Sequence, residues 1–164
     1  HTGGRLLIQP GGSFTTNTRL QLSGTLANNP PTVEFRASAG TLTGGFFIGN
    51  SGTGTVEVTQ GAIVNAIPQP PGGVGSGFTT LGNAAGSVGT LTISGAGSQL
   101  ITSAIPAGFV IGGSGTGRVV VSDHATLNTH AHILMAASPD SAATLDIASF
   151  STVLSVDSLW VGGP

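Results

Sequence analysis

Six copies of a short alternating pattern of apolar and polar residues recur along the chain. Each copy is a five-residue segment with apolar second and fourth positions, and consecutive copies lie about 28 residues apart on average. Alternation of this kind places both apolar side chains on one face of a β-strand. Recurrence at about 20–50 residues is typical of solenoids, in which each repeat stacks on the next. The apolar pairs are Leu6/Ile8, Val33/Phe35, Val56/Val58, Leu91/Ile93, Val119/Val121 and Leu145/Ile147.

Each repeat also contains two further apolar points, which predict a second and a third strand. The second points are Phe14, Leu42, Val64, Leu100, Leu127 and Val153/Leu154. The third points are Leu20/Leu22, Phe47/Ile48, Leu81, Val110/Ile111, Leu134/Met135 and Trp160/Val161. The pattern therefore predicts an all-β fold, a single parallel β-solenoid domain over residues 1–164 with about six turns of three short strands. Each strand is expected to pair with its counterpart one turn away, at about 4.8 Å.

The predicted turns are joined by glycine-rich corners and by three longer insertions. Glycine supplies the positive φ and close backbone approach that a tight stacked corner needs. Inserted loops are expected at residues 24–31, 66–77 and 103–108. In repeat folds such excursions often form the binding face, but a rigid scaffold also tolerates drift in loop length. We favour drift in loop length and keep the binding face as the alternative.

One repeat motif resembles that of a known class of bacterial surface proteins. The motif reads IGNSGTGTVEV at residues 48–58, followed by LGN at 81–83 and LTISGAGS at 91–98. It is similar to the repeat associated with bacterial autotransporter passengers and PEP-CTERM surface proteins. The resemblance is clearest over residues 46–127, and it implies a right-handed parallel β-helix displayed outside a bacterial cell. The motif carries no catalytic residues to transfer to this chain.

Composition argues against several classes of function. Charged residues make up 6% of the 164, with four Arg and no Lys. Four scattered Arg cannot form the basic surface that a phosphate backbone requires, so we expect no nucleic-acid partner. No apolar run approaches the roughly 18 residues of a membrane-spanning helix. The chain has no Cys and therefore no disulfide framework.

The aligned repeats place two carboxylates side by side. The middle positions of the six first strands are expected to form one outward row, in which Glu34 and Glu57 are neighbours, and Arg36 points the same way as Glu34. Paired carboxylates could cleave a polysaccharide or hold a cation weakly. The alternative is an exposed Glu–Arg–Glu cluster that relieves repulsion, and we favour it because no third acid or base aligns. The outward row is Leu7, Glu34, Glu57, Thr92, Val120 and Asp146.

A second polar cluster contains Asp123, His124, His130 and His132. Two imidazoles on one strand face near a carboxylate suit zinc, and His130 and His132 have the spacing to share such a face. The alternative is a set of solvated surface residues, because Asp123 aligns with the turn positions of Gln60 and Gly95. We favour the surface interpretation and assign no metal-binding, cofactor-binding or catalytic residues.

Aromatic residues give a third candidate. Phe46, Phe78 and Phe109 each open a third segment, 32 and 31 residues apart. An exposed aromatic ladder would suit sugar binding, whereas an internal stack is the commoner use of repeated Phe in a solenoid. We expect the internal stack.

The two ends of the sequence match successive parts of one repeat. VGGP at 161–164 followed by HTGGRLLI at 1–8 resembles IGGSGTGRVVV at 111–121. We expect either a segment of a longer solenoid or subunits that stack head to tail into a fibre. The favoured function is a structural extracellular protein without enzymatic activity. The alternatives are an adhesin that binds glycans or host proteins and, less favoured, a polysaccharide-degrading enzyme.

Overall fold

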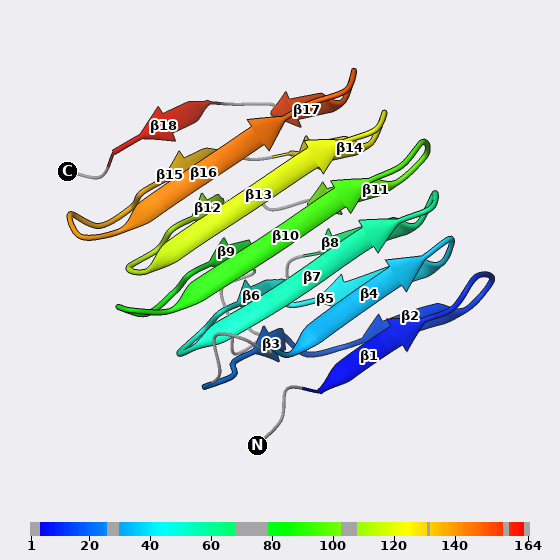
Figure 1. Ribbon diagram of the computed structural model, residues 1–164, viewed down its shortest axis with the longest axis horizontal. Helices are drawn as coiled ribbons and strands as arrows, with labels where there is room; N and C mark the ends of the chain where they lie inside the picture. The colour runs from blue at the N-terminus through cyan, green and yellow to red at the C-terminus, as the bar shows by residue number, and fades with distance from the viewer. Residues whose placement is uncertain are drawn as a thin grey trace.

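The computed structural model describes residues 4–25, 30–67, 79–102, 108–130, 132–155 and 158–162. Within these ranges the regular elements are all strands, which lie in three parallel sheets of six strands each. The chain visits the three sheets in turn, so each strand pairs with the one three elements later. In Figure 1 the first sheet runs across the front and the chain returns behind it before rising to the next strand, which is a right-handed coil. The predicted parallel β-solenoid with three strands per turn is confirmed.

The three sheets have the following strands. The first sheet contains β1 (Arg5–Ile8), β4 (Thr32–Arg36), β7 (Thr53–Thr59), β10 (Val88–Ser94), β13 (Thr116–Ser122) and β16 (Ala142–Ile147). The second contains β2 (Ser13–Thr16), β5 (Ala39–Thr43), β8 (Ile63–Ile67), β11 (Gln99–Thr102), β14 (Thr126–Thr129) and β17 (Thr152–Ser155). The third contains β3 (Leu20–Leu22), β6 (Phe46–Ile48), β9 (Thr79–Leu81), β12 (Phe109–Ile111), β15 (Ile133–Met135) and β18 (Leu159–Val161).

The register of the first sheet agrees with the alternating pattern at every strand. The two apolar positions of each repeat form two inward rows, and the intervening position forms an outward row from Leu7 to Asp146. In the middle turns the inward side chains are fully buried, because a strand with a neighbour on each side leaves no gap for water. The core is therefore a column of stacked apolar layers. Its first-sheet members include Val56, Val58, Leu91, Ile93, Val119 and Val121.

One of the expected alignments, that of Leu42 with Phe14 and Val64, is wrong by two residues. Leu42 lies in a row with Thr16 and Ala66, whereas Gly40 occupies the position in line with Phe14. Both positions face inward, but glycine gives no apolar signal in the sequence, so the next apolar residue takes its place in an alignment by pattern.

The expected aromatic stack is also interrupted. Phe46 and Phe109 are internal and almost completely buried, as expected, but Thr79 occupies the position between them in the third sheet. Phe78 lies outside the described residues.

Gly40 makes room for the largest side chain in its turn. Phe35 stands in the row that holds Val58, Ile93 and Val121 in later turns, so its ring projects further across the core. A Cβ atom on Gly40 would lie 2.7 Å from Cε1 of Phe35. The ring also meets Phe14 edge to face, with centroids 6.2 Å apart. A large residue and a missing side chain therefore compensate each other within one turn.

The corner that leads into the first sheet confirms the expected use of glycine. Gly82 has a φ of +63°, and a Cβ atom there would lie 2.3 Å from the carbonyl oxygen of Thr116 in the next turn. Gly49 and Gly112 repeat this left-handed conformation in the neighbouring turns. The turns can approach to strand-pairing distance at this corner because no side chain separates them.

Most residues of the expected insertions lie outside the described residues. Residues 26–29, 68–78 and 103–107 lie outside the described part of the chain, and these ranges cover most of the loops predicted at 24–31, 66–77 and 103–108. At the edge of the first of these, Gly24 exchanges two backbone hydrogen bonds with Thr53, at 2.7 and 2.8 Å.

The compensation between Phe35 and Gly40 predicts a strongly non-additive double mutant. Phe35→Val alone leaves a cavity over Gly40 and should destabilise the protein by about 3 kcal/mol. Gly40→Val alone forces a side chain into the Phe35 ring and should cost about 2 kcal/mol. The double variant reproduces the Val58 and Val64 pair of the next turn, so its urea-unfolding free energy should exceed that expected from the sum of the two losses. Strict additivity would contradict this packing.

Candidate functional sites

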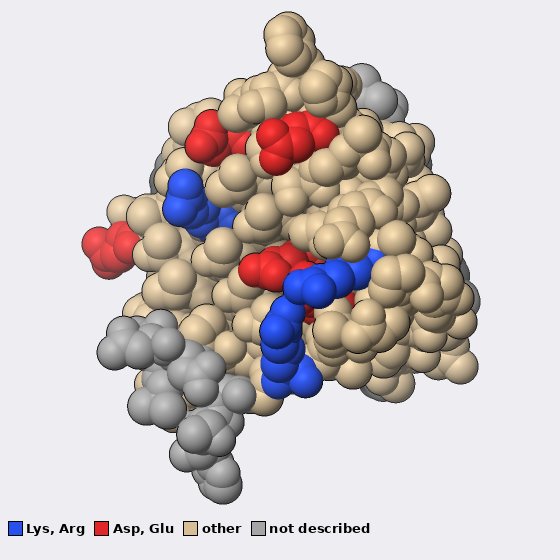
Figure 2. Space-filling view, turned by 45° about the vertical axis from the view of Figure 1, so that its right-hand side comes forward, with Lys and Arg blue, Asp and Glu red and all other residues tan. Residues whose placement is uncertain are grey.

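Three charged side chains of the first sheet, Arg5, Glu34 and Arg36, form a compact ion-pair cluster. Glu34 lies in the outward row next to Glu57, as the sequence predicts. Its two carboxylate oxygens accept hydrogen bonds from Arg5, on the preceding strand, and from Arg36, two residues further along β4. Figure 2 shows acidic and basic side chains meeting near the middle of this face, with further charged side chains elsewhere on it. The cluster thus joins the first two turns of the coil.

Glu34 is buried although it lies on the outer face of the sheet. Its side chain is only 4% exposed, because Arg5 and Arg36 lie over it. Burial by itself raises the pKa of Glu34, but the hydrogen bond from Arg36, the hydrogen bond from Arg5 and their charges outweigh it and hold the pKa below its ordinary value. The hydrogen bond to Glu34 likewise raises the pKa of Arg5. The expectation of an exposed cluster is therefore wrong for Glu34.

This arrangement makes Glu34 a structural anion. A carboxylate held ionised by two guanidinium groups is a weak general base, and it cannot supply a proton near neutral pH. The sequence prediction of this cluster did not include Arg5, which lies on the neighbouring strand. Its position two residues before Leu7 on the same strand was the available signal, since residues two apart share a face.

The structure separates the members of the Asp123 and histidine cluster. Asp123 and His124 lie in a corner with left-handed backbone, as the alignment of Asp123 with Gln60 predicts. The His124 ring stacks on Phe150 with centroids 5.7 Å apart. His132 Nδ1 lies 2.9 Å from Ser158 Oγ.

The prediction that His130 and His132 share a strand face is wrong. Both lie between β14 and β15, in a corner. The strand pattern ends at Thr129, and the alternation of faces ends with it. Among the described residues, no three His, Cys, Asp or Glu side chains gather as metal ligands would.

A shallow groove of about 440 Å³ crosses the outer face of the third sheet, and the sequence analysis did not anticipate it. Outward residues of four successive third strands form its floor, among them Phe47 and Thr80. Asn50 and Asn83 lie along one side, where Asn83 Nδ2 donates a hydrogen bond to Asn50 Oδ1 at 2.9 Å. The groove is lined by Arg19, Gln21, Phe47, Asn50, Thr80, Asn83, Val110 and Gly113.

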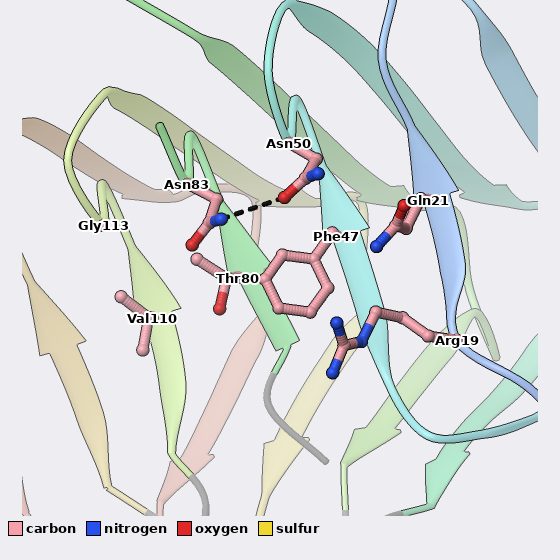
Figure 3. Close-up of a pocket in the computed structure, with 8 residues that line it drawn as sticks. All are labelled: Arg19, Gln21, Phe47, Asn50, Thr80, Asn83, Val110 and Gly113. Carbon is pink, nitrogen blue, oxygen red and sulfur yellow. Dashed lines mark hydrogen bonds between the residues drawn. The ribbon is translucent and has the colours of Figure 1, made fainter. Parts of the chain in front are cut away.

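Arg19 is the one ionisable side chain in the lining of this groove. Its guanidinium carbon lies 4.3 Å from the centroid of the Phe47 ring, a cation–π contact. Figure 3 shows the guanidinium beside that ring, with the Gln21 amide above it and the two asparagines further along. The groove therefore combines one positive charge with three amides. This is a donor-rich surface suited to ligands that carry hydroxyl and carboxylate groups.

The end turns of the coil expose apolar side chains whose equivalents are buried elsewhere. At one end Leu6 is 41% exposed, whereas Val56 and Leu91 in the same row are fully buried. At the other end Ile147 is 49% and Val161 73% exposed. The reason is geometric, since an end strand has a paired neighbour on one side only. Each end is an apolar surface edged by strands. The backbone N–H and C=O groups on the free side of these strands point along the coil axis, away from the molecule.

No family model, curated protein or solved structure matches this chain. The resemblance to autotransporter and PEP-CTERM repeats therefore stays a prediction from the motif at residues 48–58. Within the part of the chain that the structure describes, no helix has the length and apolar character needed to cross a membrane.

Glu34 predicts a defined pH dependence of stability. Because its folded-state pKa is lowered from an ordinary value of about 4.5, the ionised form stabilises the fold above that pH. This contribution is lost as the pH falls through the lower folded-state value. Glu34→Gln should cost about 2 kcal/mol at pH 7 and should flatten the loss of stability below about pH 4.5 in chemical unfolding.

The control is Glu57→Gln, which makes the same change one turn away in the same row. It should leave most of the pH dependence in place. An equal effect of the two substitutions would contradict the special role of the Arg5–Glu34–Arg36 cluster.

Proposed function

We propose that this chain is a structural β-solenoid, a rod segment or fibre subunit that is extended at its end turns by further parallel strands. The observation that carries this proposal is the exposure of the inward rows at both ends, where Leu6 and Ile147 continue rows that are fully buried in the middle turns. Such an end gains both backbone hydrogen bonds and apolar burial when another turn is added.

The interior supports the same function. A column of apolar layers with strand pairing along three sheets is stiff along its axis. Because its cross-section repeats, an added turn would make the same contacts as the existing turns. We place the protein outside a bacterial cell, on the strength of the repeat motif at residues 48–58. The proposal gives the protein no catalytic role.

The rod proposal predicts fibres of a fixed mass per length. Six strands per sheet at about 4.8 Å give a rise of about 29 Å per chain, so a single-stranded fibre of the 16.0 kDa chain should contain about 5.5 kDa per nm. Electron microscopy of the purified protein, with mass-per-length measurement, checks this value. Chains that stay monomeric at millimolar concentration would contradict self-assembly.

The groove on the third sheet favours a second candidate, an adhesin that binds acidic saccharides. The adhesin expected from the sequence relied on the loops at 66–77 and 103–108, which lie largely outside the described residues, whereas the floor of the groove is built from strands. Asn50, Asn83 and Gln21 would hydrogen-bond sugar hydroxyls, and Arg19 would pair with a uronic acid carboxylate.

The adhesin candidate predicts a charge-selective glycan array. The protein should retain oligosaccharides that contain uronic acid and release their neutral counterparts, and Arg19→Gln should weaken retention about tenfold or more. Arg118→Gln is the matched control, since it removes an exposed Arg from the first sheet. Equal retention by the Arg19 and Arg118 variants would exclude the groove as the site.

A further inference from the structure

We propose that the surface completing the last turn of the coil is the first turn of a second copy of this chain, with β16 pairing in parallel to β1. This inference rests on the proposed rod function and makes it specific, because it names the partner and the register. In that register Leu145 meets Leu6 and Ile147 meets Ile8 of the second copy. Both pairs extend the inward rows of the first sheet.

The other two sheets continue in the same register. Val153 of β17 would lie beside Phe14 of the second copy, and Val161 of β18 beside Leu22. Each contact joins two apolar residues. The rows that contain them are apolar in every turn, except that the Phe14 row has glycine at Gly40. A shift by one residue would turn these side chains outward and lose all of the contacts together.

Charge complementarity supports this register. Asp146 is exposed in the outward row of β16, and Arg5 is exposed at the start of β1. With Thr144 beside Arg5 of the second copy, Asp146 would lie one diagonal step from that Arg. Arg5 and Glu34 have this same diagonal relation within one chain, where they form an ion pair. Arg5 of the second copy would therefore lie between two carboxylates.

Shape complementarity at the neighbouring corner points to the same partner. Phe150 is 90% exposed and stacks on His124 of the turn below it. In the aligned corners, Phe150 and His124 correspond to Gly11 of the first turn. A Cβ atom on Gly11 would meet nothing within 4 Å, so that corner is open. The Phe150 ring would lie over Gly11 of the second copy and continue the His124 stack.

The test uses two charge-reversal variants of the whole chain, singly and mixed. Asp146→Arg would place an Arg diagonal to Arg5 of the next copy, and Arg5→Asp would place an Asp diagonal to Asp146. Each variant alone should need at least about tenfold higher concentration than the unaltered protein to assemble in sedimentation velocity. An equimolar mixture should assemble near the original concentration, because both of its junctions then pair opposite charges.

The matched control is Thr92→Arg, which puts an Arg in the same outward row two turns away from the end and should leave assembly unchanged. Circular dichroism of each variant verifies the fold, since Arg5→Asp also removes a partner of Glu34. If Arg5→Asp unfolds, Asp146→Arg and Phe150→Ala carry the test, and both should weaken assembly by the same tenfold criterion.

The outcomes separate this inference from the rod function itself. Assembly of the unaltered protein that is insensitive to all three end variants would overturn the register while leaving the rod function in place. Failure of the unaltered protein to assemble at any concentration would overturn the pairing of copies together with the fibre-subunit form of the rod. Weakened assembly of each charge variant by itself, with assembly restored in their mixture, would support the proposed junction.

Discussion

Everything in this molecule depends on one constraint, that each strand must pair in parallel with its equivalent in the turn above and the turn below. Parallel pairing fixes the distance between turns at about 4.8 Å. At this distance the side chains of consecutive turns are in contact, so the residues of one turn limit those of the next. A side chain at one level is in contact with the same position at the next level. The residues of this fold are therefore constrained row by row, because each side chain must pack against its neighbours in the same row.

The Phe35 and Glu34 sites show two ways of accommodating an exception to the row. Phe35 is too large for its row, and the loss of a side chain at Gly40 absorbs the excess volume. Glu34 is a charge beside another carboxylate, and two Arg residues neutralise and cover it. In both cases the compensating residues lie on the same strand, on the adjacent strand of the sheet or on the next strand of the same turn. The exceptions therefore stay local, and the regular stacking above and below them is undisturbed.

Much of this fold could be predicted because the rows are visible as periodic apolar residues. The first sheet was predicted strand by strand, since apolar and polar residues alternate without interruption in the strands that contain Val56, Leu91 and Val119. The failures occurred where the signal depended on contacts that the pattern of a single strand does not show. Gly40 carries no apolar signal although it is a core position, and Arg5 became relevant only through its diagonal contact with Glu34. The groove was not predicted for the same reason, since Arg19, Phe47 and Asn83 line one surface only through the stacking of three turns.

The way these exceptions are contained also bears on how such a chain could lengthen by duplication. Phe35 and Gly40 belong to one turn, so a copied segment carrying both would bring its own volume correction to any new location. Glu34, by contrast, draws one of its two Arg partners from the preceding turn. Copying the second turn alone would set a second glutamate beside the first and leave it with Arg36 only. The smallest segment that carries Glu34 together with both of its Arg partners is therefore the first two turns.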